Sequence, residues 1–243
     1  MKLTDFEVLT FDCYGTLIDW ETGLFNSLRP LVARADRAMS REEALAEFGR
    51  HEFAQQTETP AMPYSQLLAV VYRRLAKQWE IATRNEEANI FGASIPDWPE
   101  FADSAAALQY LKRYYKLVIL SNVDRVSFRS SNARLQVDFD AIYTAQDIES
   151  YKPSQRNFDY MLRRLKEDFG LDKSALLHVA QSLLHDHAPA NRAGLASAWI
   201  DRRHAEDGWG ATMPPAGTPH YDYRFESMAA LADAHRKEIA AGA

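Results

Sequence analysis

The sequence predicts an α/β protein, a doubly wound parallel sheet with a helical cap inserted after the first strand. A short apolar run, residues 8–11, ends at Asp12 and is followed by Gly15, as in a buried strand that leads into a turn. From about residue 97 onward, apolar runs alternate with segments of helical spacing. That alternation is typical of a parallel sheet covered by helices on both faces.

The segment between these two parts is expected to be helical. Residues from about 22 to 89 are rich in Ala, Leu, Arg and Glu, with apolar side chains at helical spacing. Pro60 and Pro63 are expected to divide this segment into two halves. We therefore expect a core domain formed by residues 1–18 and 97–243, and a cap domain formed by residues 19–96.

Beyond residue 96, helices and strands are expected to alternate along the chain. The expected helices cover about residues 104–113, 125–135, 155–168 and 189–193, and the expected strands cover residues 117–120, 141–143, 176–179 and 198–200. Residues 208–219 are rich in Gly and Pro and are expected to form a surface loop. Because open α/β sheets bind ligands at the carboxyl ends of their strands, the polar residues that follow the strands are the candidates for a site.

Composition excludes several classes of function. The formal net charge of -6 over 243 residues does not suggest a general nucleic-acid footprint. Cys13 is the only cysteine, so no intrachain disulfide can form, which fits a reducing compartment. The N-terminus does not resemble a signal peptide, and no window approaches the roughly 18 apolar residues of a membrane span. We expect a cytoplasmic protein that binds neither nucleic acid nor membrane.

Asp12 is the first candidate for chemistry. Taken alone, an aspartate at this place can simply cap a turn. A carboxylate can also act as a nucleophile and form an ester intermediate that water then hydrolyses. Gly15 would let the chain turn sharply, and the Thr16 hydroxyl can hold an oxygen of Asp12 or of a substrate, or bond to nearby backbone.

Three further groups of polar residues stand near expected strand ends. Ser121 and Asn122 can bind an anion together with backbone N–H groups, or can begin a helix. Lys152 would keep a buried aspartate ionised, although most lysines are solvated. Asp186 lies between two histidines, but adjacent residues rarely face one ion and no second His or Cys cluster follows, so structural zinc is not expected.

The segments around Asp12, Ser121, Lys152 and Asp186, in their order along the chain, resemble the conserved segments of the haloacid dehalogenase superfamily. The first segment, Phe-Asp-Cys-Tyr-Gly-Thr-Leu at residues 11–17, is the most specific. The resemblance covers essentially the whole chain, implies a Rossmann-like core with a helical cap, and is strongest to the L-2-haloacid dehalogenase (type II) group. A homodimer is suggested by the family alone.

Tyr14 distinguishes the branches of that superfamily. The phosphatase branch usually has a second aspartate at this position, which serves as general acid and base for the leaving oxygen. A halide needs no proton to leave, so a dehalogenase can do without that acid. The dehalogenase group also works without a metal ion, and the resemblance therefore implies no cofactor.

The resemblance implies a covalent mechanism with named residues. Asp12 would displace halide from a short 2-haloalkanoic acid, and water would hydrolyse the resulting ester to give the 2-hydroxy acid. Lys152 would pair with Asp12, and Asp186 would place or activate the water. The residues implied to position the nucleophile, or to bind the substrate or the halide, are Tyr14, Thr16, Arg50, Ser121 and Asn122.

The chain departs from the dehalogenase pattern at two places. Phe158 stands where the group has a tyrosine six residues after the lysine, which removes a hydroxyl. The segment before Asp186 lacks the usual serine and asparagine and carries one extra residue. Gln181 and Ser182 can replace the missing polar groups, and His185 adds a possible general base.

Two other functions stay open at this point. A magnesium-dependent phosphatase or C–P hydrolase would bind Mg²⁺ through Asp12, the carbonyl of Tyr14 and Asp186, because hard cations prefer oxygen ligands. A non-catalytic binding protein with the same fold is the other. Four aromatic residues are candidates for pocket walls, or for ordinary core: Trp20, Phe48, Phe53 and Tyr64.

Overall fold

The computed structural model describes residues 1–242 and shows a six-stranded sheet with the strand order β3-β2-β1-β4-β5-β6. Every neighbouring pair of strands in this sheet is parallel, which confirms the predicted fold class. The strands are β1 (Val8–Phe11), β2 (Lys116–Ser121), β3 (Ala141–Thr144), β4 (Leu176–Ala180), β5 (Ala196–Ile200) and β6 (Tyr223–Phe225).

Helices cover both faces of the sheet, and for this reason β1 and β4 are buried along their whole length. On one face, Leu9 and Phe11 pack in a cluster with side chains of α5 (Ser104–Leu111), α6 (Arg125–Leu135) and α10 (Met228–Gly242). On the other face, Val8 packs with side chains of α8 (Gln155–Phe169) and α9 (Ala188–Ala193). Alternate residues of one strand therefore serve two separate cores.

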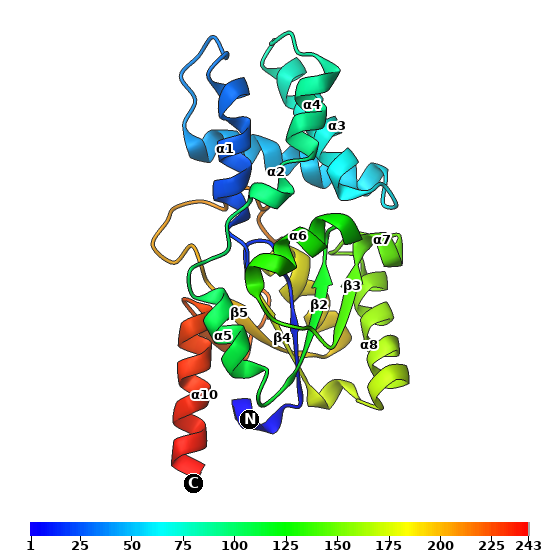
Figure 1. Cartoon of the computed structure of the whole chain (residues 1–243), viewed down its shortest axis with the longest axis vertical. Coiled ribbons are helices and arrows are strands. Elements are labelled where there is room, and N and C mark those ends of the chain that lie inside the picture. The colour runs from blue at the N-terminus through cyan, green and yellow to red at the C-terminus, as the bar shows by residue number, and fades with distance from the viewer. Residues whose placement is uncertain (243) are drawn as a thin grey trace.

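The long segment between β1 and β2 is helical, as expected. It forms α1 (Trp20–Val32), α2 (Arg41–Glu58), α3 (Tyr64–Gln78) and α4 (Asn85–Gly92), and all four fall within the segment predicted as the cap. Pro60 and Pro63 lie between α2 and α3, where the predicted break occurs. Figure 1 shows these helices gathered beyond the carboxyl ends of the strands. Asp12 directly follows β1 at that end of the sheet.

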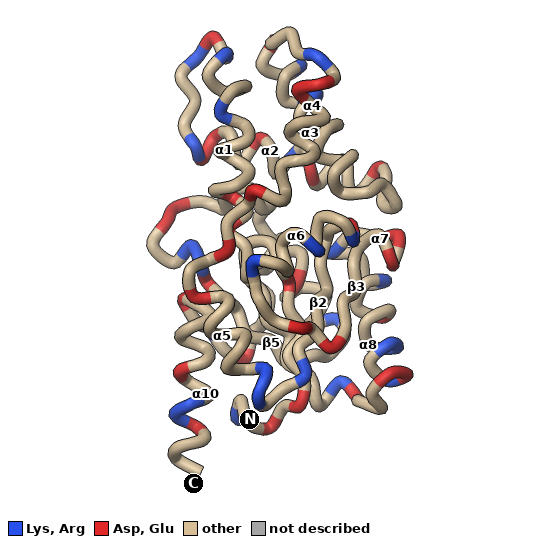
Figure 2. The backbone as a smooth tube through the Cα atoms, in the orientation of Figure 1, with Lys and Arg blue, Asp and Glu red and all other residues tan. Residues whose placement is uncertain are grey.

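The C-terminal part contains elements that the sequence pattern did not predict. After the loop at residues 208–219, the chain adds the short edge strand β6 and the helix α10, which lies beside α5 (Figure 1). In α10, His235 Nδ1 lies 3.0 Å from the Tyr110 hydroxyl of α5. Within residues 1–242, no helix combines the length and apolar character needed to cross a membrane. Acidic and basic residues are interspersed along both the cap helices and the core (Figure 2).

Candidate active site

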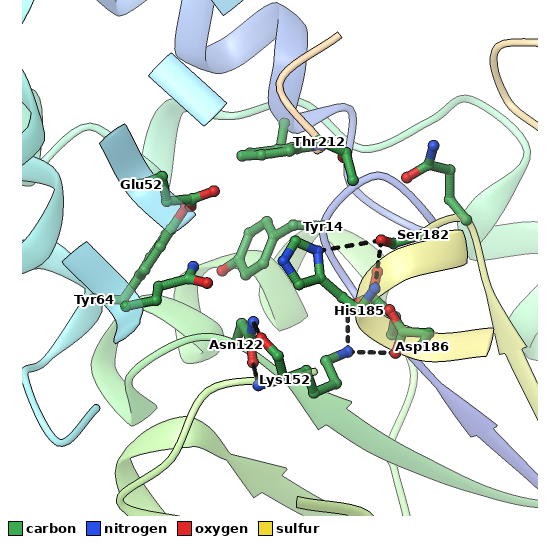
Figure 3. A pocket seen from close by; sticks show the side chains of 13 residues that line it. Tyr14, Glu52, Tyr64, Asn122, Lys152, Ser182, His185, Asp186 and Thr212 are labelled. Carbon is green, nitrogen blue, oxygen red and sulfur yellow. Dashed lines mark hydrogen bonds and ion pairs between the residues drawn. The ribbon is translucent and has the colours of Figure 1, made fainter. Parts of the chain in front are cut away.

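Asp12, Lys152 and Asp186 meet at the carboxyl edge of the sheet. The Lys152 Nζ atom lies 2.9 Å from Asp12 Oδ1 and 2.6 Å from Asp186 Oδ1, and it also donates to the carbonyl of Leu120 at 2.9 Å. The exposed fractions of the three residues are 6%, 2% and 0% for Asp12, Lys152 and Asp186. The ammonium group therefore forms a buried bridge between two carboxylates, which Figure 3 shows for Lys152 and Asp186.

The charges of this cluster stabilise one another. Burial raises the pKa of Asp12, and the neighbouring Lys152 opposes that rise. Burial would also raise the pKa of Asp186, but Lys152 and His178 hold it well below its usual range. Burial would lower the pKa of Lys152, but the two carboxylates more than compensate and raise it. Lys152 and Asp186 are consequently charged at neutral pH.

The turn after β1 fixes the second oxygen of Asp12. The Thr16 hydroxyl donates to Asp12 Oδ2 at 2.9 Å, and its oxygen accepts from the backbone N–H of Gln181 at 3.0 Å. Gly15 has φ +92°, and a Cβ atom there would lie 3.1 Å from both Gln181 Oε1 and Trp20 Nε1. Glycine is therefore required at this turn by its backbone conformation and by the close approach of its neighbours.

A π-helical turn, Leu183–His187, carries Asp186 into the site. A π-turn is an α-helical turn with one residue inserted, and such turns are frequent at functional sites. Such a turn offers a place for the one extra residue that the resemblance implies before Asp186. Asp186 Oδ2 is buried and has no hydrogen-bond partner among the described residues, so it is free to accept from a water or a ligand.

His178, inside β4, holds the other oxygen of Asp186. Its Nε2 lies 3.0 Å from Asp186 Oδ1, and its Nδ1 lies 2.8 Å from the hydroxyl of Thr10 on β1. Because an ionised carboxylate only accepts, Nε2 donates this bond. The His178 ring packs edge-on against Phe158, with ring centroids 5.1 Å apart. His178 thus places a polar contact on Asp186 beside the phenyl ring of Phe158.

Sequence reasoning missed His178 as a functional residue. It lies in the run Leu-Leu-His-Val-Ala and is fully buried, so it read as part of an ordinary core strand. The available signal was a titratable side chain within an otherwise apolar, buried strand, because such a group needs polar partners.

Asn122 and Ser121 differ from each other in their surroundings. The Asn122 side chain donates from Nδ2 to the carbonyl of Lys152 at 3.0 Å and accepts from the Lys152 N–H at 2.7 Å. Asn122 lines the pocket, yet both of its polar atoms hold the backbone that carries Lys152. The Ser121 hydroxyl is buried with no partner among the described residues, and Ser121 does not line the pocket.

The structure does not bring Arg50 to the site, which corrects its expected place beside the halide. Its side chain is 55% exposed and its nearest acidic partner is Glu47, at 3.9 Å. Arg50 lies two residues from both Phe48 and Glu52 on α2, and two residues correspond to about 200° around a helix. Since Phe48 and Glu52 face inward, Arg50 faces solvent.

Helices α1, α2 and α3 contribute one wall of the pocket over Asp12. The pocket has about 40 Å³ of space open to water, which suits a ligand of a few carbon atoms. The predicted site residues that line it are Asp12, Tyr14, Asn122, Lys152, Gln181, Ser182, His185 and Asp186. Trp20 and Tyr64 also line it, whereas Phe48 lies in the core and Phe53 lines a neighbouring outer cavity.

His185 presents a neutral imidazole to this pocket. Burial lowers the pKa of His185 to about 4, so the ring is uncharged at neutral pH. Its Nδ1 lies 3.2 Å from the Ser182 hydroxyl, while its Nε2 is buried with no partner among residues 1–242. The ring can therefore exchange a proton or a hydrogen bond with a ligand through Nε2.

The cap contributes a carboxyl group that the sequence reasoning missed. Glu52 lines the pocket, is 4% exposed and accepts from the Tyr64 hydroxyl at 2.5 Å. Burial raises the pKa of Glu52 to about 7, and the bond from Tyr64 only partly opposes it. The signal was its spacing, since Glu52 follows Leu45 by seven residues and Phe48 by four, on the apolar side of α2.

The family model for haloacid dehalogenase-like hydrolases matches residues 6–194. No curated protein sequence matches the chain.

Among solved structures, the L-2-haloacid dehalogenase PA0810 is 20% identical, with a TM-score of 0.76 over 96% of this chain and 99% of that chain. The L-2-haloacid dehalogenase from Xanthobacter autotrophicus with chloropropionic acid covalently bound is 16% identical, with a TM-score of 0.74 over 95% and 98% of the two chains. The hydrolase YfnB from Bacillus subtilis, bound to magnesium, is 16% identical, with a TM-score of 0.70 over 95% and 99%. At these identities the likeness shows a shared fold.

Proposed function

Because the chain belongs to the haloacid dehalogenase-like hydrolase family, we propose that it hydrolyses the carbon–halogen bond of short 2-haloalkanoic acids to give 2-hydroxy acids. The observation that carries this proposal is the set of residues around the Asp12 carboxylate. Lys152 binds one of its oxygens and Thr16 binds the other, and Tyr14 stands where a phosphatase would have its second acid. The site thus has a nucleophile and no acid at that position, which suits a leaving group that needs no proton.

The first step forms a covalent ester. A carboxylate oxygen of Asp12 attacks the carbon that bears the halogen, a C–O bond forms, and the C–halogen bond breaks with its electron pair leaving on the halide. Lys152 favours the ionised carboxylate, because its ammonium group lies 2.9 Å from Oδ1. The rings of Trp20 and Tyr64 line the pocket beside the nucleophile, and such apolar surroundings reduce its hydration and strengthen its interaction with the carbon.

The second step releases the product and regenerates Asp12. A water attacks the Cγ of the ester, and the bond between Cγ and the product oxygen breaks. One water proton goes to the product hydroxyl, the other is released, and the water oxygen stays in the Asp12 carboxylate. Asp186 Oδ2, buried without a partner among residues 1–242, is the acceptor that orients this water, and the neutral His185 lines the same pocket.

The proposed reaction does not call for a magnesium ion, because the halide leaves without a proton or a metal. The Lys152 ammonium group binds one oxygen of Asp12 and one oxygen of Asp186, so it already supplies positive charge to both carboxylates. A phosphatase would instead bind Mg²⁺ through Asp12, the carbonyl of Tyr14 and Asp186.

Halide release from 2-chloropropionate is expected to continue unchanged in the presence of a chelator. Chloride can be measured directly, and the released proton gives a second, independent reading in a pH-stat. A panel of phosphomonoesters, with and without Mg²⁺, serves as the control. Phosphate release that requires magnesium, without chloride release, would replace this function by the phosphatase. Silence from both at high enzyme concentration would favour a non-catalytic binding protein.

Replacing His178 by Phe is expected to lower kcat and KM together, so that kcat/KM, which reports the ester-forming step, stays nearly unchanged. The substitution keeps the packing against Phe158 but removes the bond to Asp186, and a hydrogen bond to a charged group is worth about 1.5–3 kcal/mol, or roughly 10–150-fold in rate. Because Asp186 acts on water, the ester on Asp12 should accumulate and be detectable by mass spectrometry. Thr10→Val, which removes only the far partner of His178, should have a smaller effect. An unchanged kcat would refute the positioning role.

A further inference from the structure

Glu52 is a buried carboxyl group without a cation. It is 4% exposed, and among the described residues it makes no ion pair with Lys, Arg or His. Asp12 and Asp186 are also buried, but both share Lys152. A buried carboxylate that lacks a counterion is costly, and a ligand that carries a cation would remove that cost.

A second hydrogen-bond acceptor accompanies Glu52. Gln56 lies one helical turn further along α2, is 5% exposed and also lines the pocket. Its Oε1 is buried and has no hydrogen-bond partner among residues 1–242. Two adjacent acceptors on one wall, one of them unsatisfied, call for a ligand group that donates several hydrogen bonds.

Aromatic rings surround this end of the pocket. Tyr14, Trp20 and Tyr64 all line it, and the rings of Tyr14 and Tyr64 are stacked with centroids 6.4 Å apart. The faces of such rings carry negative electrostatic potential and attract cations. A carboxyl group, an amide oxygen and aromatic rings together are the chemistry that recognises an ammonium group.

Glu52 lies away from the reacting centre. Figure 3 shows Glu52 and Tyr64 on one side of the pocket, with Lys152 and Asp186 on the other. The hydrogen-bond partner of Glu52 is the Tyr64 hydroxyl, whereas Lys152 pairs with Asp12 and Asp186 and not with Glu52. A group so placed contacts the far end of a substrate, and it does not assist the halide that leaves from the carbon beside Asp12.

The charge balance of the pocket points to the same kind of ligand. Among the described residues that line it, the acids are Asp12, Glu52 and Asp186, and the one permanent cation is Lys152. A plain haloalkanoate would bring one more negative charge into this pocket. A ligand that carries an ammonium group as well as a carboxylate adds no net charge and supplies the cation that Glu52 lacks.

We propose that the substrate is a short amino-substituted 2-haloalkanoic acid whose protonated amino group binds to Glu52 and Gln56. Its halogen-bearing carbon would lie at Asp12, a placement that rests on the proposed dehalogenase function. The amino group would donate to the free oxygen of Glu52 and to Gln56 Oε1. The Tyr64 hydroxyl holds the other oxygen of Glu52 in place.

Binding of two halogen-free ligands of equal length tests this proposal. 4-Aminobutanoate and pentanoate differ only in a terminal ammonium group against a methyl group, and calorimetry on the whole protein measures both affinities. We expect 4-aminobutanoate to bind at least about tenfold more tightly, a factor equivalent to about 1.4 kcal/mol. Glu52→Gln should remove this preference, whereas Glu58→Gln, on the exposed part of the same helix, should preserve it.

The structural effect of the variant is a separate readout. Glu52→Gln keeps the shape of the side chain and removes a buried ionisable group, so its Tm should equal or exceed that of the wild type. A large drop in Tm would mean that Glu52 serves the fold, and the proposal would then be wrong. Equal binding of the two ligands, tighter binding of pentanoate, or no measurable binding of either would also overturn it.

Kinetics separate this proposal from the function on which it rests. Halide release from 4-amino-2-chlorobutanoate and from 2-chloropentanoate is compared after the enzyme-free rate is subtracted. A higher kcat/KM for the amino acid, lost in Glu52→Gln, supports the proposal. Efficient release from 2-chloropentanoate without an amino preference would leave the dehalogenase function standing and remove the ammonium site. Tight binding of 4-aminobutanoate without halide release from either compound would leave the ammonium site standing and count against the dehalogenase function.

Discussion

Asp12→Asn is expected to stop turnover while leaving the fold intact. Asparagine has the same shape, and its amide oxygen still accepts from Lys152 or Thr16, but a neutral amide is a poor nucleophile. Loss of a covalent nucleophile removes at least roughly a thousandfold of the rate in enzymes of this kind. Lys152 keeps Asp186 as its counterion, so the buried charge stays paired. Chloride release and thermal unfolding of the same preparation measure the two effects.

An isotope experiment tests the covalent step itself. In a single turnover in water labelled with ¹⁸O, with enzyme in excess, the product hydroxyl should contain unlabelled oxygen, because that oxygen comes from Asp12. The label should instead enter the carboxylate of Asp12, and mass spectrometry of the peptide that contains it can detect this. Label in the product of the first turnover would mean that water attacks the substrate directly, which would contradict covalent catalysis.

Asp19→Asn provides a matched control for Asp12→Asn. Asp19 caps the N-terminus of α1, where its Oδ1 accepts from the Thr22 N–H at 3.2 Å. Asparagine caps helices about as well as aspartate, so activity and stability should both be preserved. Loss of activity in this control as well would mean that the turn after β1 tolerates no change, and the result at Asp12 would lose its meaning.

The sheet and its central cluster could be predicted because both depend on local sequence. Residues 8–11 are apolar apart from Thr10 since β1 is buried on both faces, and most residues of β2 and β4 are likewise apolar and buried. Parallel strands bring their carboxyl ends to one edge, so Asp12 and the residues that follow the other strands had to meet there. The short strand β6 lies at the sheet edge and is only partly buried, so it lacks such an apolar run.

The residues that the cap places in the pocket could not be predicted as well as those of the sheet. Whether Arg50 or Glu52 faces Asp12 depends on the rotation of α2 about its axis and on how the cap sits on the core. The Leu45 and Phe48 spacing gives the rotation, and it places Glu52 inward and Arg50 outward. The position of the cap depends on contacts between distant residues, and no pattern within α2 contains that information.

The surroundings of Asp186 could be predicted from the sequence only in part. The extra residue before it was visible in the sequence, but its accommodation by a π-helical turn is a property of the backbone. His178 contacts Asp186 from eight residues earlier, and Thr10 supports it from the neighbouring strand. The register of β1 against β4, which pairs Thr10 with His178, brings these side chains together.

Lys152→Met is expected to destabilise the protein strongly. Methionine has a similar length, so packing is largely kept, but Asp12 and Asp186 are left buried without their counterion. Removal of one partner from a buried ion pair costs about 3–5 kcal/mol. For a chain of this size that corresponds to a fall in Tm of roughly 6–20 °C. Denaturant unfolding and calorimetry measure the loss, and activity should disappear with it.

A double variant separates the missing counterion from damage to packing. Lys152→Met combined with Asp186→Asn leaves one buried carboxyl group in place of two, so it should recover part of the lost stability. In a double-mutant cycle the two substitutions should therefore be strongly non-additive, as is usual for residues in contact. Additive losses would mean that Lys152 stabilises the fold through its aliphatic chain.

The stability lost in Lys152→Met should depend on pH, and this dependence tests whether Lys152 is the counterion of the two carboxylates. In the wild type, the pKa of Asp186 lies below its unfolded value, so its stabilising contribution is present above an unfolded pKa of about 4 and is lost as pH falls further. Without Lys152, burial and mutual repulsion raise the pKa of one carboxyl group of the pair above its unfolded value. That penalty is present at neutral pH and is relieved as pH falls through the raised pKa. The difference in unfolding free energy between wild type and Lys152→Met should therefore shrink from pH 7 to pH 4, and a constant difference would show that the ammonium group is not the counterion of this pair.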